Sequence, residues 1–168
     1  KSALAVFCEL IKARLTFLVL LTTLVGFYVG TRGAMDWLLM VRALAGTTLL
    51  ACGASALNQL WEREHDAKMR RTESRPLPSK RLTPQTVLVF GGACSVAGLI
   101  WLAFAVNLLT ALLGAATLSS YLFIYTPLKR VTWLNTAVGA VPGAMPPLLG
   151  WTAARNDLSI EGWALFAI

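Results

Sequence analysis

The chain has 168 residues, of which 57% are hydrophobic and 14% are charged, whereas about 25% of the residues of an average soluble domain are charged. With a mean hydropathy of +0.65, this composition excludes a disordered chain, a coiled coil and a small water-soluble domain, and it is typical of a polytopic membrane protein. The net charge of +7, from 15 Lys and Arg against 8 Asp and Glu, would suggest nucleic-acid binding in a soluble protein.

Runs without a charged residue locate the membrane-spanning helices, because a span needs roughly 20 residues to cross a hydrocarbon core about 30 Å thick. The run 82–128 is too long for one span, and Asn107 is the best candidate for a turn within it. Another apolar run begins at Gly162. We therefore predict an all-α, polytopic transmembrane helix bundle with five spans and the start of a sixth, in a single membrane domain 1–168 that is the amino-terminal part of a longer chain. The predicted spans are 13–31, 38–60, 84–105, 108–126 and 134–152.

Most of the basic residues lie on one side of this predicted bundle. They precede the first span or lie in the loops after the second and fourth spans, as Lys1, Lys12, Arg14, Arg63, Lys68, Arg70, Arg71, Arg75, Lys80, Arg81, Lys129 and Arg130. Because cytoplasmic loops of membrane proteins are enriched in Lys and Arg, this side is predicted to face the cytoplasm. The positive charge is thus mostly a signal of topology, and we expect no nucleic-acid partner.

Three oxygen-bearing side chains recur at the end of the second predicted span. Asn58, Glu62 and Asp66 are spaced i, i+4 and i+8, which places them on one face of a helix with a drift of about 40° per step. Two carboxylates at this spacing repel each other unless a cation lies between them. Amide and carboxylate oxygens are ligands that Mg²⁺ prefers, completed by water and substrate phosphates. The pattern predicts a magnesium site.

The segment that follows is rich in arginine. Arg70 and Arg75 come soon after Asp66, and the arginine fork is a natural bidentate partner for phosphate. Pro76 and Pro78 prevent the helix from continuing, so the loop 72–84 is expected to fold back or to lie over the site. A metal-binding helix end followed by arginines suits a diphosphate, although a solvated loop whose cations pair with its acids is the common alternative.

A second polar segment follows the fourth predicted span. Tyr125 and Lys129 form a YxxxK pattern at its cytoplasmic end. The fifth span is unusually rich in proline and glycine and is predicted to be bent or broken. Either a structural kink or the wall of a ligand cavity would explain this composition. The residues concerned are Gly139, Pro142, Gly143, Pro146, Pro147 and Gly150.

These motifs resemble those of the UbiA-type intramembrane prenyltransferases. The resemblance rests on the Asn58, Glu62 and Asp66 pattern, on RPLPS at 75–79, and on Tyr125 with Lys129. Two longer strings, DAKMRRTESRPLP at 66–78 and YTPLKRVTWLNTAVGAVPGAMPPLLGW at 125–151, are similar to the branch of this family that farnesylates protoheme IX. The chain departs from many family members in having Glu62 where they have aspartate, which still supplies a carboxylate.

The resemblance implies a nine-helix bundle around a central cavity that is capped by cytoplasmic loops. It also implies an Mg²⁺-dependent enzyme that transfers a farnesyl group from farnesyl diphosphate to a vinyl group of heme B, giving heme O for heme-copper oxidases. The expected location is the bacterial cytoplasmic (inner) membrane, with the active site facing the cytoplasm and a heme A synthase as a partner. A second acidic motif, expected after the sixth span, would lie beyond this chain.

The resemblance further implies roles for individual residues. Asn58, Glu62 and Asp66 would hold Mg²⁺ and, with Lys129, take part in catalysis. The diphosphate would bind to Arg14, Arg70, Arg75, Lys129 and Tyr125. Three alternatives stay open: another UbiA-type transferase that acts on an aromatic acid or a chlorophyll precursor, a transporter or channel subunit, and a heme-binding assembly factor without catalysis. Transporters place ionisable residues near the middle of the bilayer, whereas the third and fourth predicted spans contain none.

Overall fold

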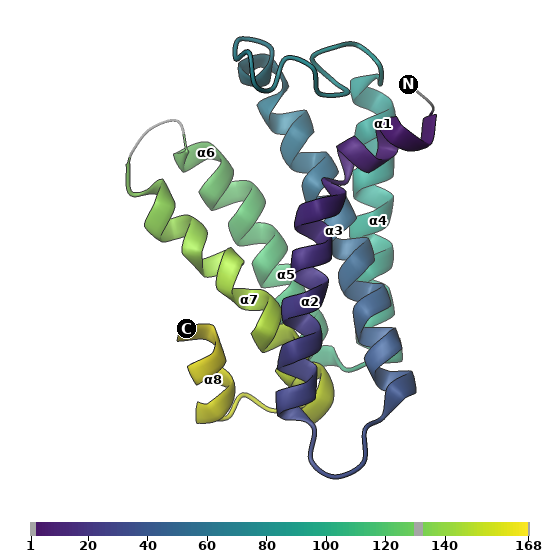
Figure 1. Ribbon diagram of the computed structural model, residues 1–168, viewed down its shortest axis with the longest axis vertical. Helices are drawn as coiled ribbons and strands as arrows, with labels where there is room; N and C mark the ends of the chain where they lie inside the picture. Colours follow the sequence, from purple (N-terminus) through teal and green to yellow (C-terminus); the bar gives the residue numbers. More distant parts are fainter. Residues whose placement is uncertain (1–2, 130–132, 168) are drawn as a thin grey trace.

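The computed structural model describes residues 3–129 and 133–167, which form one bundle of helices (Figure 1). Five long helical stretches run along the bundle, and two short helices, α1 and α8, lie near its ends. The elements are α1 (Ala3–Leu10), α2 (Ala13–Gly30), α3 (Trp37–Asp66), α4 (Pro84–Ala105), α5 (Leu108–Ser119), the π-helical segment η1 (Ser120–Tyr125), α6 (Thr126–Leu128), α7 (Asn135–Arg155) and α8 (Ile160–Ala167).

The predicted spans are confirmed as helices. Within the part of the chain that is described, four stretches are long and apolar enough to cross a membrane: α2, α3, α4 and the continuous run Leu108–Leu128. The turn predicted at Asn107 is also present, because this side chain caps α5 by accepting a hydrogen bond from the Thr110 backbone N–H at 2.8 Å. Lys1 and Arg130, which were used for the topology, lie outside the described residues.

The fifth predicted span differs from expectation in one respect. It forms the continuous helix α7, 21 residues long, although Pro142, Pro146 and Pro147 lie inside it. The span was predicted to be bent or broken, and the break does not occur. Each proline removes one backbone donor, but a helix packed against neighbours can tolerate that loss. Helix α7 is not among the four stretches that are apolar enough to cross a membrane by composition, which agrees with its content of proline, glycine and threonine.

Glycines let the helix backbones approach closely where α2 crosses α7. A Cβ atom at Gly26 would overlap the carbonyl oxygen of Pro147, and one at Gly150 would overlap the carbonyl oxygen of Thr23. The two helices therefore touch backbone to backbone at this crossing. This contact fixes α7 beside α2, and residues nearer the other end of the two helices line a cavity, among them Leu15 and Thr16 of α2 and Gly139 and Pro142 of α7.

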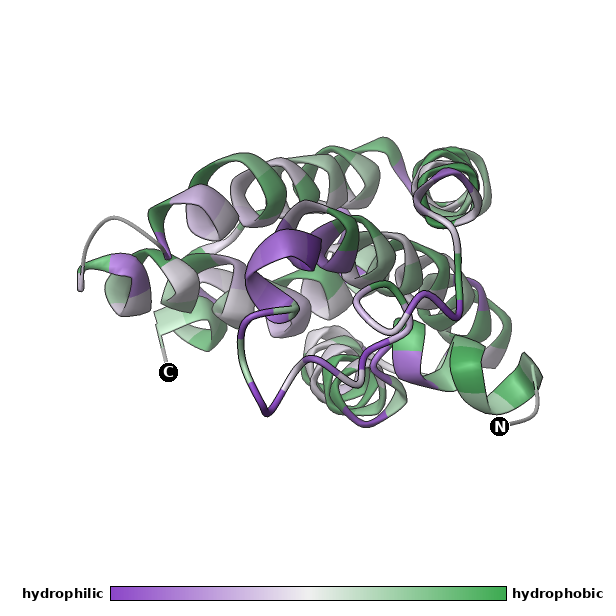
Figure 2. Cartoon of the chain, turned by 90° about the horizontal axis from the view of Figure 1, so that it is seen from above, coloured by the Kyte–Doolittle hydropathy of each residue, from purple (hydrophilic) through white to green (hydrophobic). Residues whose placement is uncertain are grey.

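Polar residues gather at one end of the bundle. Seen from above in Figure 2, the hydrophilic colour concentrates on the end of α3 and on the loop that follows it. Helix α3 extends six residues beyond the predicted limit of 60, to Asp66. A buried apolar cluster of Leu10, Ala56, Leu77 and Val87 lies at the same end and joins α1, α3, α4 and the loop. The loop is therefore packed onto the bundle and lies over the end of α3.

Candidate active site

The polar face of α3 is buried. Asn58, Glu62 and Asp66 are 2%, 5% and 4% exposed, although they lie in the last turns of a helix that ends at the polar end of the bundle. The i, i+4, i+8 spacing places all three side chains on one face, as predicted, and the structure shows that this face is buried. Burying a carboxylate costs free energy unless the group is paired with a cation and hydrogen-bonded. The partners of these side chains therefore determine the chemistry of this face.

Each of the three side chains is contacted by a cation from a different segment of the chain. Lys12 Nζ, just before α2, donates to Asn58 Oδ1 at 2.8 Å. Lys129 Nζ, just after α6, lies 3.2 Å from Glu62 Oε1. From the loop after α3, Arg75 Nη1 lies 2.6 Å from Asp66 Oδ2 and 3.8 Å from Glu62 Oε2. The repulsion expected between the two carboxylates is therefore offset by cations from outside the helix.

Lys12 was not predicted as a site residue. It has a left-handed backbone conformation, with φ of 49°, and forms the corner between α1 and α2. Burial lowers the pKa of the Lys12 ammonium to about 8, and repulsion by Arg75 and Lys129 adds to this effect, while attraction by Glu62 and Asp66 opposes it. The sequence offered only a lysine in a basic terminal segment, which topology alone explains.

Asn58 is oriented from its other side by Thr126, which sequence reasoning also missed. The Asn58 amide Nδ2 donates to Thr126 Oγ1 at 3.1 Å, and the Thr126 hydroxyl donates in turn to the Tyr121 carbonyl at 2.8 Å. The π-helical turn η1 separates these two residues by five positions. Because its amide group is bound to Thr126, Asn58 presents its carbonyl oxygen toward Lys12, which is the orientation that a metal ligand needs.

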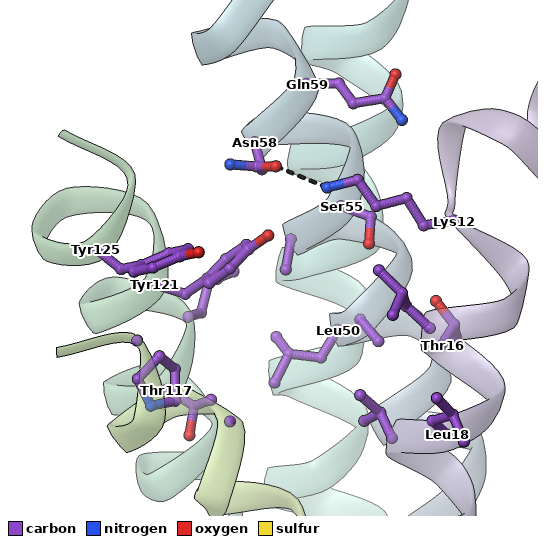
Figure 3. A pocket seen from close by; sticks show the side chains of 18 of the residues that line it. Lys12, Thr16, Leu18, Leu50, Ser55, Asn58, Gln59, Thr117, Tyr121 and Tyr125 are labelled. Carbon is purple, nitrogen blue, oxygen red and sulfur yellow. Dashed lines mark hydrogen bonds between the residues drawn. The ribbon is translucent and has the colours of Figure 1, made fainter. Parts of the chain in front are cut away.

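A cavity of about 820 Å³ opens beside this face. Figure 3 shows Lys12 reaching Asn58 at its polar end, with the rings of Tyr121 and Tyr125 opposite α3 and Leu18 and Leu50 further along the walls. The two tyrosine rings are stacked, with centroids 5.6 Å apart. The cavity is therefore polar at one end and mainly apolar along its length.

Helix α7 supplies one wall of this cavity. Its lining residues are Gly139, Pro142, Gly143 and Pro146. A Cβ atom at Gly139 would lie 2.5 Å from the Tyr125 ring, whereas nothing lies within 4 Å of one at Gly143. Glycine at 139 thus makes room for the tyrosine, and glycine at 143 leaves open space. Of the two explanations for this composition, the placement favours a cavity wall.

Two of the predicted diphosphate residues are not brought to the cavity. Arg14 and Arg70 are exposed and do not line it, whereas Lys129, Arg75 and Tyr125 do. Arg71 lines the cavity in place of Arg70. Neighbouring positions of a turn point in different directions, so charge density in the sequence could not select the arginine that lines the cavity.

Few side chains at this site could bind a metal ion. Within residues 3–129 and 133–167, no group of three or more His, Cys, Asp or Glu side chains lies together in a way that could hold a metal ion. The described residues offer two carboxylates and one amide oxygen on α3. This set fits Mg²⁺, which typically takes one or two carboxylates and fills its other positions with water and phosphate oxygens.

Comparison with known proteins gives closely related sequences. The chain is 50% identical to the protoheme IX farnesyltransferase of Solibacter usitatus, over 96% of this chain and 59% of that protein. It is 47% identical to the enzyme of that name from Myxococcus xanthus, over 95% and 54%. The human mitochondrial protoheme IX farnesyltransferase is 40% identical, over 97% and 37%. The chain thus spans between about a third and three fifths of the length of these curated relatives.

Solved structures share the fold. The structure described for digeranylgeranylglyceryl phosphate synthase superposes with a TM-score of 0.85 at 16% identity, over 97% of this chain and 57% of that chain. A UbiA homologue from Archaeoglobus fulgidus, solved with DMAPP and Mg²⁺, gives a TM-score of 0.76 at 17% identity, over 95% and 58%. Residues 19–168 also match the UbiA prenyltransferase family. The buried polar face of α3 is therefore part of a known fold, and the chain belongs to the UbiA prenyltransferase family.

Proposed function

We propose that this protein transfers a farnesyl group from farnesyl diphosphate to a vinyl group of protoheme IX (heme B) and so makes heme O. The observation that carries the proposal is the buried polar face of α3 beside the cavity, where Asn58, Glu62 and Asp66 each contact a cation from another segment. Asn58 and all three cations, Lys12, Arg75 and Lys129, line the cavity. The names of the relatives support the choice of farnesyl diphosphate and heme B.

Asn58, Glu62 and Asp66 would hold Mg²⁺, and the metal would screen the charge of the diphosphate and stabilise it as a leaving group. Two features support this assignment. The three side chains are buried on one face, and a cation already lies at hydrogen-bonding distance from an oxygen of each. A group of oxygens that holds protein cations in this way is suited to holding a metal cation in their place.

Lys12, Arg75 and Lys129 bind the diphosphate. When the diphosphate enters, these three cations leave their contacts with the oxygens of α3 and bind phosphate oxygens instead, because the diphosphate carries more negative charge. Negative charge grows on the diphosphate when the bond between C1 of the farnesyl group and oxygen breaks, and cations already in position stabilise it without reorganisation. Tyr125 lies at the same end of the cavity, where its hydroxyl orients a phosphate or the edge of the heme.

The apolar walls hold the farnesyl chain and keep bulk water away from its allylic cation, which would otherwise be hydrolysed. The cavity of about 820 Å³ lies within the usual range of about 300–1,000 Å³ for ligand pockets. In the balanced reaction the terminal vinyl carbon bonds to C1 of the farnesyl group, and the diphosphate leaves with the electron pair. A water oxygen bonds to the inner vinyl carbon, and one proton is released.

We place the polar end of the bundle at the cytoplasmic face of the bacterial inner membrane. The side chains of Lys12, Arg71, Arg75 and Lys129 all line the cavity there, and basic residues mark the cytoplasmic side of membrane proteins. Farnesyl diphosphate would then enter from the compartment in which a charged, soluble substrate is available. A heme A synthase, which would take heme O onward, is the expected protein partner.

The test is the mass of the product. The intact protein in lipid nanodiscs is incubated with farnesyl diphosphate and Mg²⁺ and with either heme B or 4-hydroxybenzoate. Of the two acceptors, we expect only heme B to react, and its product should carry one added farnesyl group and one added hydroxyl group. Asp66→Asn should abolish this product, and Glu64→Gln, which alters an exposed carboxylate on the same helix, should retain it. Prenylation of 4-hydroxybenzoate would assign another transferase activity, and no product with either acceptor would contradict the proposal.

A further inference from the structure

The loop that carries Arg75 is tied to α1 by a second arginine. Arg81 Nη2 lies 2.7 Å from Glu9 Oε2, near the end of α1. The pair is partly shielded, with side chains 25% and 33% exposed, so it is less screened by water than a typical surface pair. Arg81 and Glu9 are 72 positions apart in the chain, and their contact therefore joins two separate segments beside the cavity, which Glu9 lines.

The same arginine closes the loop on itself around Arg75. Arg81 Nε donates to Ser79 Oγ at 2.9 Å, and the Ser79 hydroxyl donates to the Arg75 carbonyl at 2.6 Å. Arg81 Nη2 also donates to the Ser74 carbonyl. The residues on both sides of Arg75 are thus held through one guanidinium group, and we call Glu9, Ser74, Ser79 and Arg81 the Arg81 clamp.

The clamp is anchored to the helix that carries the polar face. Gln59, next to Asn58, donates through Nε2 to the backbone carbonyls of Glu9 at 3.0 Å and Leu10 at 2.8 Å. Gln59 is 1% exposed, so this link is rigid. Glu9 therefore contacts the loop through its side chain and α3 through its backbone, which fixes the loop relative to the oxygen ligands.

We propose that Arg81 is a positioning residue, which holds the Arg75 guanidinium over Asp66 by clamping its loop to Glu9. Arg81 does not itself line the cavity, whereas Arg75 does, so Arg81 acts through Arg75. Arg81 Nη1 is buried without a hydrogen-bond partner among the described residues, which costs stability. Because of this cost, we assign the clamp to holding the loop in place and not to stabilising the fold. The inference rests on the proposed function, because it assigns Arg75 to the diphosphate.

Steady-state kinetics of the intact protein test this role. Arg81→Gln should raise KM for farnesyl diphosphate by about tenfold, within the losses that misplaced groups cause, and should change kcat much less. Glu9→Gln should act in the same direction. Because Arg81 acts through Arg75, the double variant Arg75→Gln/Arg81→Gln should have the KM of Arg75→Gln alone. The control is Lys80→Gln, which removes a positive charge from an exposed position of the same loop.

A second measurement separates the clamp from the proposed function. Hydrogen exchange of residues 72–83 should be faster in Arg81→Gln and Glu9→Gln than in wild type or Lys80→Gln. Unchanged exchange would overturn the clamp. Equal increases in KM with and without Arg75 would overturn the positioning role, because they would show that Arg81 acts independently. A different result would separate the two proposals. If hydrogen exchange of residues 72–83 increases in the variants but the wild-type protein neither binds nor uses farnesyl diphosphate, the proposed function is overturned. The role of the clamp in the reaction is then overturned with it.

Discussion

Replacing Arg75 by glutamine should change the affinities for metal and for diphosphate in opposite directions. In the structure Arg75 Nη1 lies 2.6 Å from Asp66 Oδ2 and 3.8 Å from Glu62 Oε2. A divalent cation that binds these oxygens without diphosphate must displace the guanidinium and is repelled by it. When the diphosphate is present, the guanidinium has a new partner. Arg75→Gln should therefore strengthen the binding of the metal alone and weaken the binding of farnesyl diphosphate.

The size of the second effect follows from the exposure of the pair. Hydrogen bonds to charged groups contribute about 1.5–3 kcal/mol. The Arg75 side chain is 26% exposed, so solvent screens part of its interaction and the lower part of that range applies. A loss of about 1.5–2 kcal/mol corresponds to a KM for farnesyl diphosphate that is about 10- to 30-fold higher. The gain in metal affinity should be smaller, because Lys129 still contacts Glu62 at 3.2 Å.

Two assays on the intact protein measure these effects. Electron paramagnetic resonance of Mn²⁺, titrated without diphosphate, gives the metal affinity, and initial rates at saturating heme B give KM. Arg63→Gln is the matched control, because Arg63 is an exposed arginine on α3 whose contact, at 3.7 Å, is to the exposed Glu64. Weaker binding of both ligands to Arg75→Gln, or equal effects of Arg75→Gln and Arg63→Gln on both affinities, would contradict competition between Arg75 and the metal.

Three further predictions follow from the same geometry. Asp66→Asn or Glu62→Gln should abolish heme O formation, measured by mass spectrometry, and near-normal activity of either variant would contradict the metal assignment. Lys129→Ala should raise KM for farnesyl diphosphate by about tenfold, since it removes a charged hydrogen-bonding group; an unchanged KM would exclude Lys129 from the diphosphate site. Gly26→Ala should lower the thermal unfolding temperature, because overpacking costs about 1–3 kcal/mol. Gly92→Ala, where a Cβ atom meets nothing within 4 Å, should not lower it, and equal effects of the two variants would argue against the close crossing of α2 and α7.

The architecture could be predicted from the sequence because the membrane imposes a strong and regular constraint. Charged residues are rare within the spans and lie near their ends, so the uncharged runs locate α2, α3 and α4 to within a few residues at most ends. Asn107 could be identified as a turn because its side chain caps a following helix. The polar face of α3 could be predicted as well, since helical periodicity relates Asn58, Glu62 and Asp66 directly.

The partners of that face could not be predicted, because they come from distant segments. Lys12 is 46 positions from Asn58, and Thr126 is 68 positions from it. No local pattern connects residues so far apart; only the packing of α2 and α6 against α3 brings them together. The choice between Arg70 and Arg71 depended on the direction of one turn, which composition does not specify. The continuity of α7 depended on packing, which outweighed the usual effect of its prolines.

The most direct test of the central claim is whether the release of diphosphate depends on heme. The intact protein is supplied with farnesyl diphosphate and Mg²⁺, and released diphosphate is measured with and without heme B. If the cavity keeps bulk water from the farnesyl cation and joins the two substrates, one diphosphate should be released for each heme B consumed, and almost none without heme. Release at the same rate without heme, or no release with it, would contradict the account.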